Sequence, residues 1–184
     1  MEIDLRPGFC VFVIMLAALD RGGALLPLAG AMLLHELGHA AVMLACGARF
    51  RQLTLRFADI RIEARGMSYR QELLCALAGP AVNLLCGVLL RANASAFAAY
   101  SLVLGLYNLL PVWPLDGGRA ALCALLCRLP PARAERLSCM GSYAVCGALL
   151  AAGLWLLFVR RAGLWPLGTA IYLILRLILL QKQE

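Results

Sequence analysis

Ionisable side chains are scarce in this chain of 184 residues, and their scarcity limits what kind of protein it can be. Lysine occurs once and histidine twice, and aspartate and glutamate together number 10. Hydrophobic residues make up 63% of the sequence, and the mean hydropathy is +0.84. A soluble domain is about 45–50% apolar. The composition therefore excludes an ordinary soluble domain and predicts a polytopic membrane protein with nearly all of its mass in the bilayer.

Signals for secretion, for metal-binding cysteine pairs and for extra domains are also lacking. The first seven residues form no basic n-region and no small-residue cleavage site follows, so we expect no removable signal peptide. None of the 8 cysteines forms a Cys-x-x-Cys pair, and nearly all lie in apolar runs, which favours buried, reduced thiols. We see no repeat, linker or second domain. We therefore expect one transmembrane domain over residues 1–184, with its core at 22–120 and neither a CBS nor a PDZ domain.

Long apolar runs predict an all-α polytopic protein with about six transmembrane helices. The runs cover residues 9–19, 24–46, 72–90, 94–110, 139–159 and 164–180, and the first is short for a full crossing. We expect a short amphipathic helix over 120–127, then a break at Pro130–Pro131 and a basic loop to Arg136.

The polar stretch 47–71 interrupts these runs, and apolar residues alternate with polar ones within it. Period-two alternation is typical of strands, so we expect a small membrane-associated β-hairpin over 53–64, between the second and third helices. Ala58–Asp59 would form the turn and Phe57 would face Ile60, although Ala-Asp is not a favoured hairpin turn.

The basic residues predict the orientation in the membrane. The formal net charge is +7, but the arginines are scattered over short loops without a basic, aromatic face, so we expect no nucleic-acid partner. Six crossings would put most of them on one side: Arg6, Arg49, Arg51, Arg56, Arg61, Arg65, Arg70, Arg119, Arg128, Arg133, Arg136, Arg176 and Lys182. The positive-inside rule places that side in the cytoplasm.

The two histidines, His35 and His39, lie one helical turn apart in the second apolar run, so their rings point the same way. Glu36 follows the first, which completes the His-Glu-x-x-His pattern of zinc metalloproteases, with two ligands and a general base on one helix. An ionisable group at membrane depth is a functional hypothesis by default. The alternative is a pair of core histidines satisfied by hydrogen bonds.

A catalytic zinc needs a third protein ligand, and the chain has no further histidine. Asp116 follows the fourth apolar run in a break rich in proline and glycine, Pro111 to Gly118, where irregular backbone can turn back into the protein. The run ends on the side toward which the histidine helix extends. Asp116 is therefore the candidate third ligand, and an Asp-Gly turn at the membrane surface is the alternative.

These motifs resemble the site-2 protease family of intramembrane metalloproteases. The resemblance rests on His35 to His39, on Asn108-x-x-Pro111-x-x-x-x-Asp116-Gly117, and on Gly79-Pro80-x-x-Asn83. The sequence around Asp116 to Arg119 and the predicted layout are most similar to the sporulation branch, that of stage IV sporulation protein FB. That resemblance implies a pro-sigma factor or another sporulation regulator as substrate.

The expected reaction follows from these residues. One zinc ion per chain, held by His35, His39 and Asp116, would activate a water from which Glu36 takes a proton. Three polar residues, Asn83, Asn108 and Arg119, are candidates for substrate binding, against helix packing for the asparagines and topology or lipid contact for the arginine. The hairpin either adds an extended substrate as a strand or only seals the cytoplasmic rim.

The sequence therefore predicts an intramembrane zinc endopeptidase. It would be a multi-pass protein of the bacterial cytoplasmic membrane, cutting a membrane-associated protein near the cytoplasmic face, with the lipid bilayer and regulatory membrane proteins as partners. A metal-binding transporter or sensor without proteolysis is the alternative, although a transporter would carry more ionisable residues along a path through the membrane. A catalytically silent scaffold is a third reading, which the complete ligand set opposes.

Overall fold

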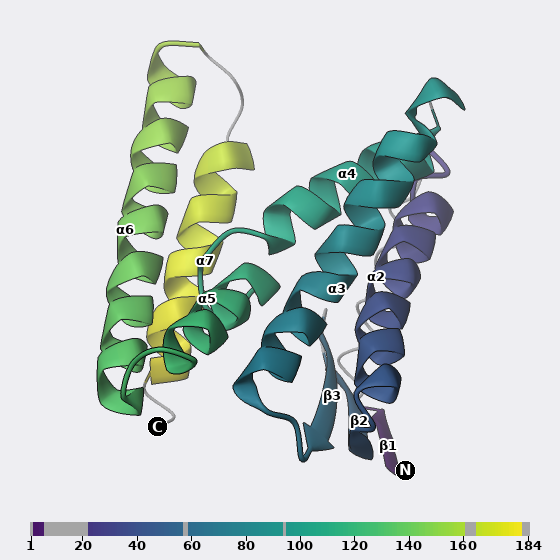
Figure 1. Cartoon of the computed structure of the whole chain (residues 1–184). Helices are drawn as coiled ribbons and strands as arrows, with labels where there is room; N and C mark the ends of the chain where they lie inside the picture. Colours follow the sequence, from purple (N-terminus) through teal and green to yellow (C-terminus); the bar gives the residue numbers. More distant parts are fainter. Residues whose placement is uncertain (1, 6–21, 57–58, 94, 161–164, 182–184) are drawn as a thin grey trace. The chain divides into compact units, whose positions relative to one another are not determined.

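The computed structural model describes residues 2–5, 22–56, 59–93, 95–160 and 165–181 (Figure 1). The chain forms two compact units, Met1–Tyr107 and Asn108–Glu184. The first holds β1 (Glu2–Leu5), α2 (Leu25–Ala45), β2 (Arg49–Arg56), β3 (Asp59–Arg65), α3 (Tyr69–Leu89), the 3-10 helix η1 (Arg91–Asn93) and α4 (Ala96–Asn108), whose last residue begins the second unit. The second continues with α5 (Asp116–Leu126), α6 (Pro131–Phe158) and α7 (Trp165–Gln181).

Three helices in the described residues are long and apolar enough to cross a membrane, namely α2, α3 and α6. Two shorter apolar helices, α4 and the stretch Pro166–Leu179 of α7, correspond to the fourth and sixth predicted segments. The predicted segment 9–19 lies outside the described residues. The mostly helical, membrane-type fold is thus confirmed, and the count of about six crossings stays a prediction.

Helix α2 ends in a Schellman motif at the residue where the predicted apolar run stops. Gly47 has φ +68°, and its N–H donates to the Leu44 carbonyl at 3.0 Å. The N–H of Ala48 donates to the Met43 carbonyl at 3.0 Å. Glycine adopts this left-handed conformation without a steric penalty, so it ends the helix cleanly after its last apolar turn.

Helix α3 begins at a capping box. The Ser68 hydroxyl accepts a hydrogen bond from the Gln71 N–H at 3.4 Å, and the Gln71 side-chain oxygen accepts one from the Ser68 N–H at 2.8 Å. These two bonds satisfy backbone donors that a helix start leaves without partners. The cap fixes the start of α3 and hence the level at which its later residues face α2.

Glycines bring α2 and α3 together side by side (Figure 1). A Cβ atom added to Gly38 would lie 3.0 Å from the Ala78 carbonyl oxygen and 3.1 Å from the Gly79 Cα atom. Such close approach of two backbones requires small residues at the crossing and is a common way for helices to pack in membranes. The crossing lies at the histidine motif, so it positions the site.

The predicted hairpin is present, and a third strand joins it. Strands β2 and β3 pair antiparallel, and β1 adds parallel to β2 in the order β1-β2-β3. Sequence patterning did not indicate β1, because a four-residue strand that pairs with a segment about 50 residues away leaves little periodic signal.

The predicted register of the hairpin is wrong. Leu55 pairs with Ile60 and Arg56 with Asp59, so the connection is 57–58 rather than Ala58–Asp59, and the expected partner Phe57 lies outside the described residues. Both registers put apolar positions opposite one another, so the alternation does not distinguish them. Ala-Asp is also too weak a turn signal to decide between the two.

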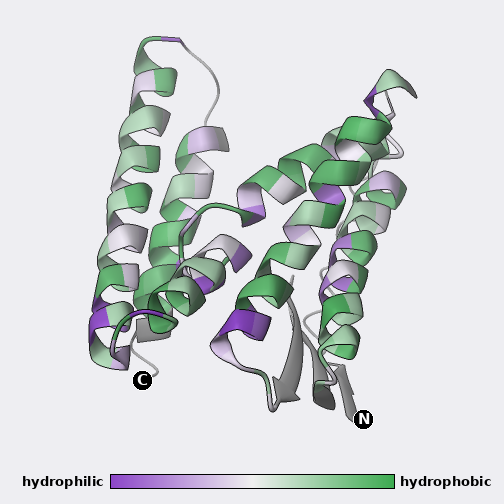
Figure 2. Ribbon diagram, viewed as in Figure 1, coloured by the Kyte–Doolittle hydropathy of each residue, from purple (hydrophilic) through white to green (hydrophobic). Residues whose placement is uncertain are grey.

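The second unit differs from the prediction at the start of α6. The double proline was expected to break the chain before a basic loop, but α6 begins at Pro131, its first residue, and runs for 28 residues. Proline is favoured at the first helical position, since its missing N–H has no helical partner there. The basic residues expected in a loop form the hydrophilic first turns of α6 (Figure 2).

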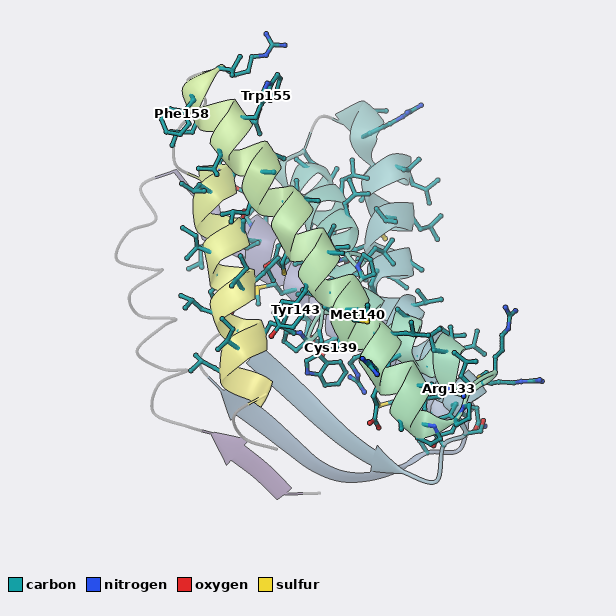
Figure 3. All side chains as sticks on the ribbon, turned by 90° about the vertical axis from the view of Figure 1, so that its left-hand side faces the viewer. Arg133, Cys139, Met140, Tyr143, Trp155 and Phe158 are labelled. Atoms are coloured by element: carbon teal, nitrogen blue, oxygen red, sulfur yellow. The ribbon has the colours of Figure 1, made fainter. Side chains whose placement is uncertain are left out.

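The rest of α6 carries an exposed apolar surface. Figure 3 shows Arg133 at one end of the helix, with Trp155 and Phe158 at the other and Met140 between them. Phe158 is 77% exposed and Met140 59% exposed. Large exposed apolar side chains along a helix of this length fit contact with lipid rather than water.

Candidate metal centre

His35 and His39 meet on one face of α2. Their Nε2 atoms are 3.1 Å apart, their ring centroids are 4.7 Å apart, and the ring planes are nearly perpendicular at 83°. Both side chains are buried, with 5% and 8% of their surface exposed. Two nitrogens that each lie ~2.0–2.1 Å from a tetrahedral zinc are about 3.3 Å apart. The spacing of the rings therefore fits two ligands of one zinc ion.

The backbone of α3 fixes the tautomer of His39. Its Nδ1 atom lies 2.7 Å from the carbonyl oxygen of Cys75. A carbonyl only accepts, so Nδ1 carries the proton and donates it, and the Nε2 lone pair can bind a metal. Metal-binding histidines are usually held by a hydrogen bond of this kind from the other ring nitrogen. The sequence gives no signal for it, because the partner is a main-chain atom on another helix.

Gly79 leaves space at the two ligand atoms. A Cβ atom at this position would lie 2.5 Å from the His39 Nε2 atom and 2.9 Å from the His35 Nε2 atom. Any larger residue would push its side chain into the nitrogens that must face the metal. The residues present therefore fit a metal at this place in both donor chemistry and available volume.

Glu36 and Asp116 supply the two carboxylates of the predicted site, and both are half-buried. Glu36 belongs to α2 directly after the first histidine, so the same helix fixes both side chains. Asp116 is the first residue of α5 and follows the loop 109–115. His35 and His39 belong to the first unit and Asp116 to the second, so the role of Asp116 as the third ligand stays a prediction.

Close packing within the second unit fixes the loop that precedes Asp116. A Cβ atom on Gly117 would overlap the Leu109 carbonyl group, and one on Gly118 would lie 2.5 Å from the backbone nitrogen of Trp113. These two glycines let the loop lie directly on the start of α5. Without them the loop would be displaced, and the carboxylate with it.

Ser142 on α6 anchors the same loop. The Trp113 N–H donates to the Ser142 hydroxyl oxygen at 3.1 Å, and this hydroxyl donates to the Ser138 carbonyl at 2.9 Å. Ser142 is fully buried, so its bonds are made away from solvent. Sequence reasoning missed this residue, because a serine within an apolar run has no motif that predicts its partner.

The three residues predicted to bind substrate lie on three different helices. Asn83 on α3 is fully buried, and its amide nitrogen lies 3.3 Å from the His35 Nδ1 atom. Asn108 is the half-buried last residue of α4, and Arg119 is exposed on α5. The Asn83 side chain is therefore in direct contact with the histidine pair.

Comparison with known proteins shows which proteins this chain is similar to. Residues 91–149 match peptidase family M50. Stage IV sporulation protein FB of Bacillus subtilis is 32% identical over 172 residues, which cover 86% of this chain and 59% of that protein. The Rip3 protein of Mycobacterium tuberculosis is 35% identical over 119 residues, covering 55% of this chain and 30% of that protein. The chain thus spans less than two thirds of either relative.

A solved structure shares the fold. The site-2 protease from Methanocaldococcus jannaschii matches with a TM-score of 0.65 at 20% identity, and the match covers 93% of this chain and 86% of that one. The sequence motif on α2, the family match over the loop before α5 and this fold point the same way. The chain is thus similar to peptidase family M50 over residues 91–149 and shares its fold with a site-2 protease.

Proposed function

We propose that this chain is an intramembrane zinc endopeptidase that hydrolyses a peptide bond of a membrane-associated protein. The observation that carries the proposal is the histidine pair on α2, whose Nε2 atoms lie 3.1 Å apart beside a glycine that leaves them room. His35, His39 and Asp116 would hold one zinc ion per chain, and the fourth position would stay open, as catalytic zinc sites require.

Each residue then has a defined task. When bound, zinc lowers the pKa of the attacking water to about 7 and offers a positive charge to the oxyanion that forms. Glu36 accepts the proton of that water and returns it to the leaving amine, so it acts first as base and then as acid. Cys75 keeps the Nδ1 proton of His39 in place through its carbonyl, so that Nε2 faces the metal.

The substrate chemistry is a second part of the proposal. An apolar protein with its site on membrane-type helices would act on a segment in or next to the bilayer. The basic residues on α5 and in the first turns of α6 favour a cytoplasmic position for this end of the protein under the positive-inside rule. By similarity to the sporulation relative, we propose a pro-sigma factor or a comparable membrane-bound regulator as substrate.

Asn108 and Arg119 remain candidates for holding the substrate. The first ends α4 next to the loop that leads to Asp116, and the second is exposed one turn into α5. An amide and a guanidinium can both bind the backbone of an extended peptide. Strand β3 is an edge strand of the sheet β1-β2-β3. An extended substrate segment would pair with its outer edge through main-chain hydrogen bonds.

The test compares membrane proteins from cells that express the unchanged chain, Glu36→Gln or Glu135→Gln. Glu135 is an exposed glutamate on α6 and is not one of the proposed site residues, so it controls for loss of a carboxylate. We expect new protein termini, found by mass spectrometry, with the unchanged chain and with Glu135→Gln but none with Glu36→Gln. Purified Glu36→Gln should still bind zinc.

Two results would overturn this function. The same termini with Glu36→Gln would remove Glu36 as the base. Zinc flux into proteoliposomes without cleavage of any membrane protein would favour the metal transporter instead.

A further inference from the structure

The amide of Asn83 lies against the Nδ1 atom of His35. His39 is fixed through the Cys75 carbonyl, whereas His35 faces a side chain, with its Nδ1 atom 3.3 Å from the Asn83 Nδ2 atom. Asn83 comes from α3, 48 residues along the chain, and is fully buried. A buried amide in this place can donate to His35 Nδ1 or accept from it, and so can favour one tautomer of the ring over the other.

The two ends of the amide serve different tautomers. The Nδ2 group can only donate, so in the orientation seen here His35 Nδ1 accepts and the ring proton is on Nε2. A metal ligand needs the opposite, with the lone pair on Nε2 and the proton on Nδ1. Turning the amide by 180° puts its oxygen where the nitrogen now lies. The turned side chain fits the same space, because the two ends of the amide have nearly the same shape.

The amide oxygen is available for that role. Asn83 Oδ1 is buried and has no hydrogen-bond partner, and it shares this state with the Ser101 hydroxyl alone among the described residues. A buried acceptor without a partner destabilises the folded protein, because it has lost its hydrogen bonds to water. The acceptor that His35 requires when it binds a metal is therefore already present on the adjacent side chain.

We propose that Asn83 is a positioning residue which selects the metal-binding tautomer of His35, its oxygen accepting the Nδ1 proton when the metal is bound. The inference rests on the proposed function, since it concerns a metal at His35. It replaces the earlier hypothesis that Asn83 binds substrate, because a side chain with no exposed surface is not available to a peptide.

Zinc affinity of three purified variants tests the proposal, each made in the Glu36→Gln background so that proteolysis plays no part. Asn83→Leu keeps the size but can neither donate nor accept, and its zinc dissociation constant should rise by about 10- to 100-fold, the usual effect of losing such a partner. Asn83→Asp can still accept the Nδ1 proton, so its zinc dissociation constant should rise by clearly less than about 10-fold. Ser101→Ala, the matched control, removes the other buried group without a partner and should not change the affinity.

Nuclear magnetic resonance of ¹⁵N-histidine reads the tautomer directly, because the chain has 2 histidines and so four ring nitrogens. In the zinc-loaded protein, His35 should show a protonated Nδ1 and a metal-bound Nε2. In Asn83→Leu that signal should broaden or divide between tautomers, whereas a residue that only packs the helices would leave it unchanged.

The outcomes separate the two proposals. Unchanged zinc affinity in a folded Asn83→Leu protein, or equal loss in Asn83→Leu and Asn83→Asp, would overturn the role of Asn83 and leave the protease intact. If Asn83→Leu does not fold, an unprotonated His35 Nδ1 in the zinc-loaded parent protein would overturn it. Absence of zinc binding in that parent would overturn the metal site itself and the role of Asn83 with it.

Discussion

Replacing Gly79 by alanine should weaken zinc binding at the proposed metal centre although it adds a single methyl group. The new Cβ atom would lie 2.5 Å from the His39 Nε2 atom and 2.7 Å from its Cε1 atom. It would also lie 2.9 Å from the His35 Nε2 atom. Carbon contacts in proteins are ordinarily ~3.5–4.0 Å, so an overlap of about 1 Å must be relieved. Either the rings turn away or the two helices separate.

The size of the effect follows from that overlap. Zinc sites tolerate ligand displacements of about 0.2 Å, so a shift of about 1 Å is several times too large. Overpacking of this kind costs about 1–3 kcal/mol. If all of it falls on the metal-bound state, the zinc dissociation constant rises by about 5- to 150-fold.

The assay is zinc competition with a chromophoric chelator on purified protein in detergent, together with thermal unfolding of the metal-free form. Gly147→Ala is the control, because a Cβ atom there meets nothing within 4 Å. Gly147 lies in the interior of α6, where alanine is favoured over glycine. The Gly147→Ala protein should therefore gain about 0.5–1 kcal/mol of unfolding free energy without a change in zinc affinity. Wild-type zinc affinity in a folded Gly79→Ala protein would refute the assigned geometry.

Three further predictions concern the second unit and the metal. Ser142→Ala removes the acceptor of the Trp113 N–H and should lower the unfolding free energy by about 1–3 kcal/mol, measured by denaturation in detergent; no change would show that the bond does not hold the loop. Gly117→Ala should displace the loop from Leu109, seen as reduced zinc affinity and faster proteolysis at the loop, and wild-type behaviour in both would contradict the packing. A chelator should abolish cleavage and zinc should restore it, whereas in Asp116→Ala zinc should restore little, since two ligands hold zinc poorly; full recovery there would exclude Asp116 as a ligand.

The sequence predicted the helices of the first unit well because their signals are strong and local. Apolar runs marked α2 and α3 to within a few residues, and Gly47 lies where the first of them ends. The start of α6 was missed because proline was taken as a helix breaker. Proline disrupts a helix when it lies in the interior, but it is favoured at the first helical position, where Pro131 lies.

The histidine pair was predictable because one helical turn relates its members, so the spacing alone brings the rings together. The groups that orient the rings were not predictable in the same way. The Cys75 carbonyl is a main-chain atom, and the contact between His35 and Asn83 depends on how deeply two helices cross at Gly38 and Gly79. No periodic pattern in a single sequence predicts how closely two helices approach where they cross.

The crossing of α2 and α3 puts two of the three proposed metal ligands on one pair of helices. These two neighbouring helices carry both imidazoles and the two groups that contact their Nδ1 atoms. The identity of residue 116 can therefore change alone. Cysteine or histidine there would offer softer or neutral donors to an unaltered pair, so the choice of ion could shift without rebuilding the helices.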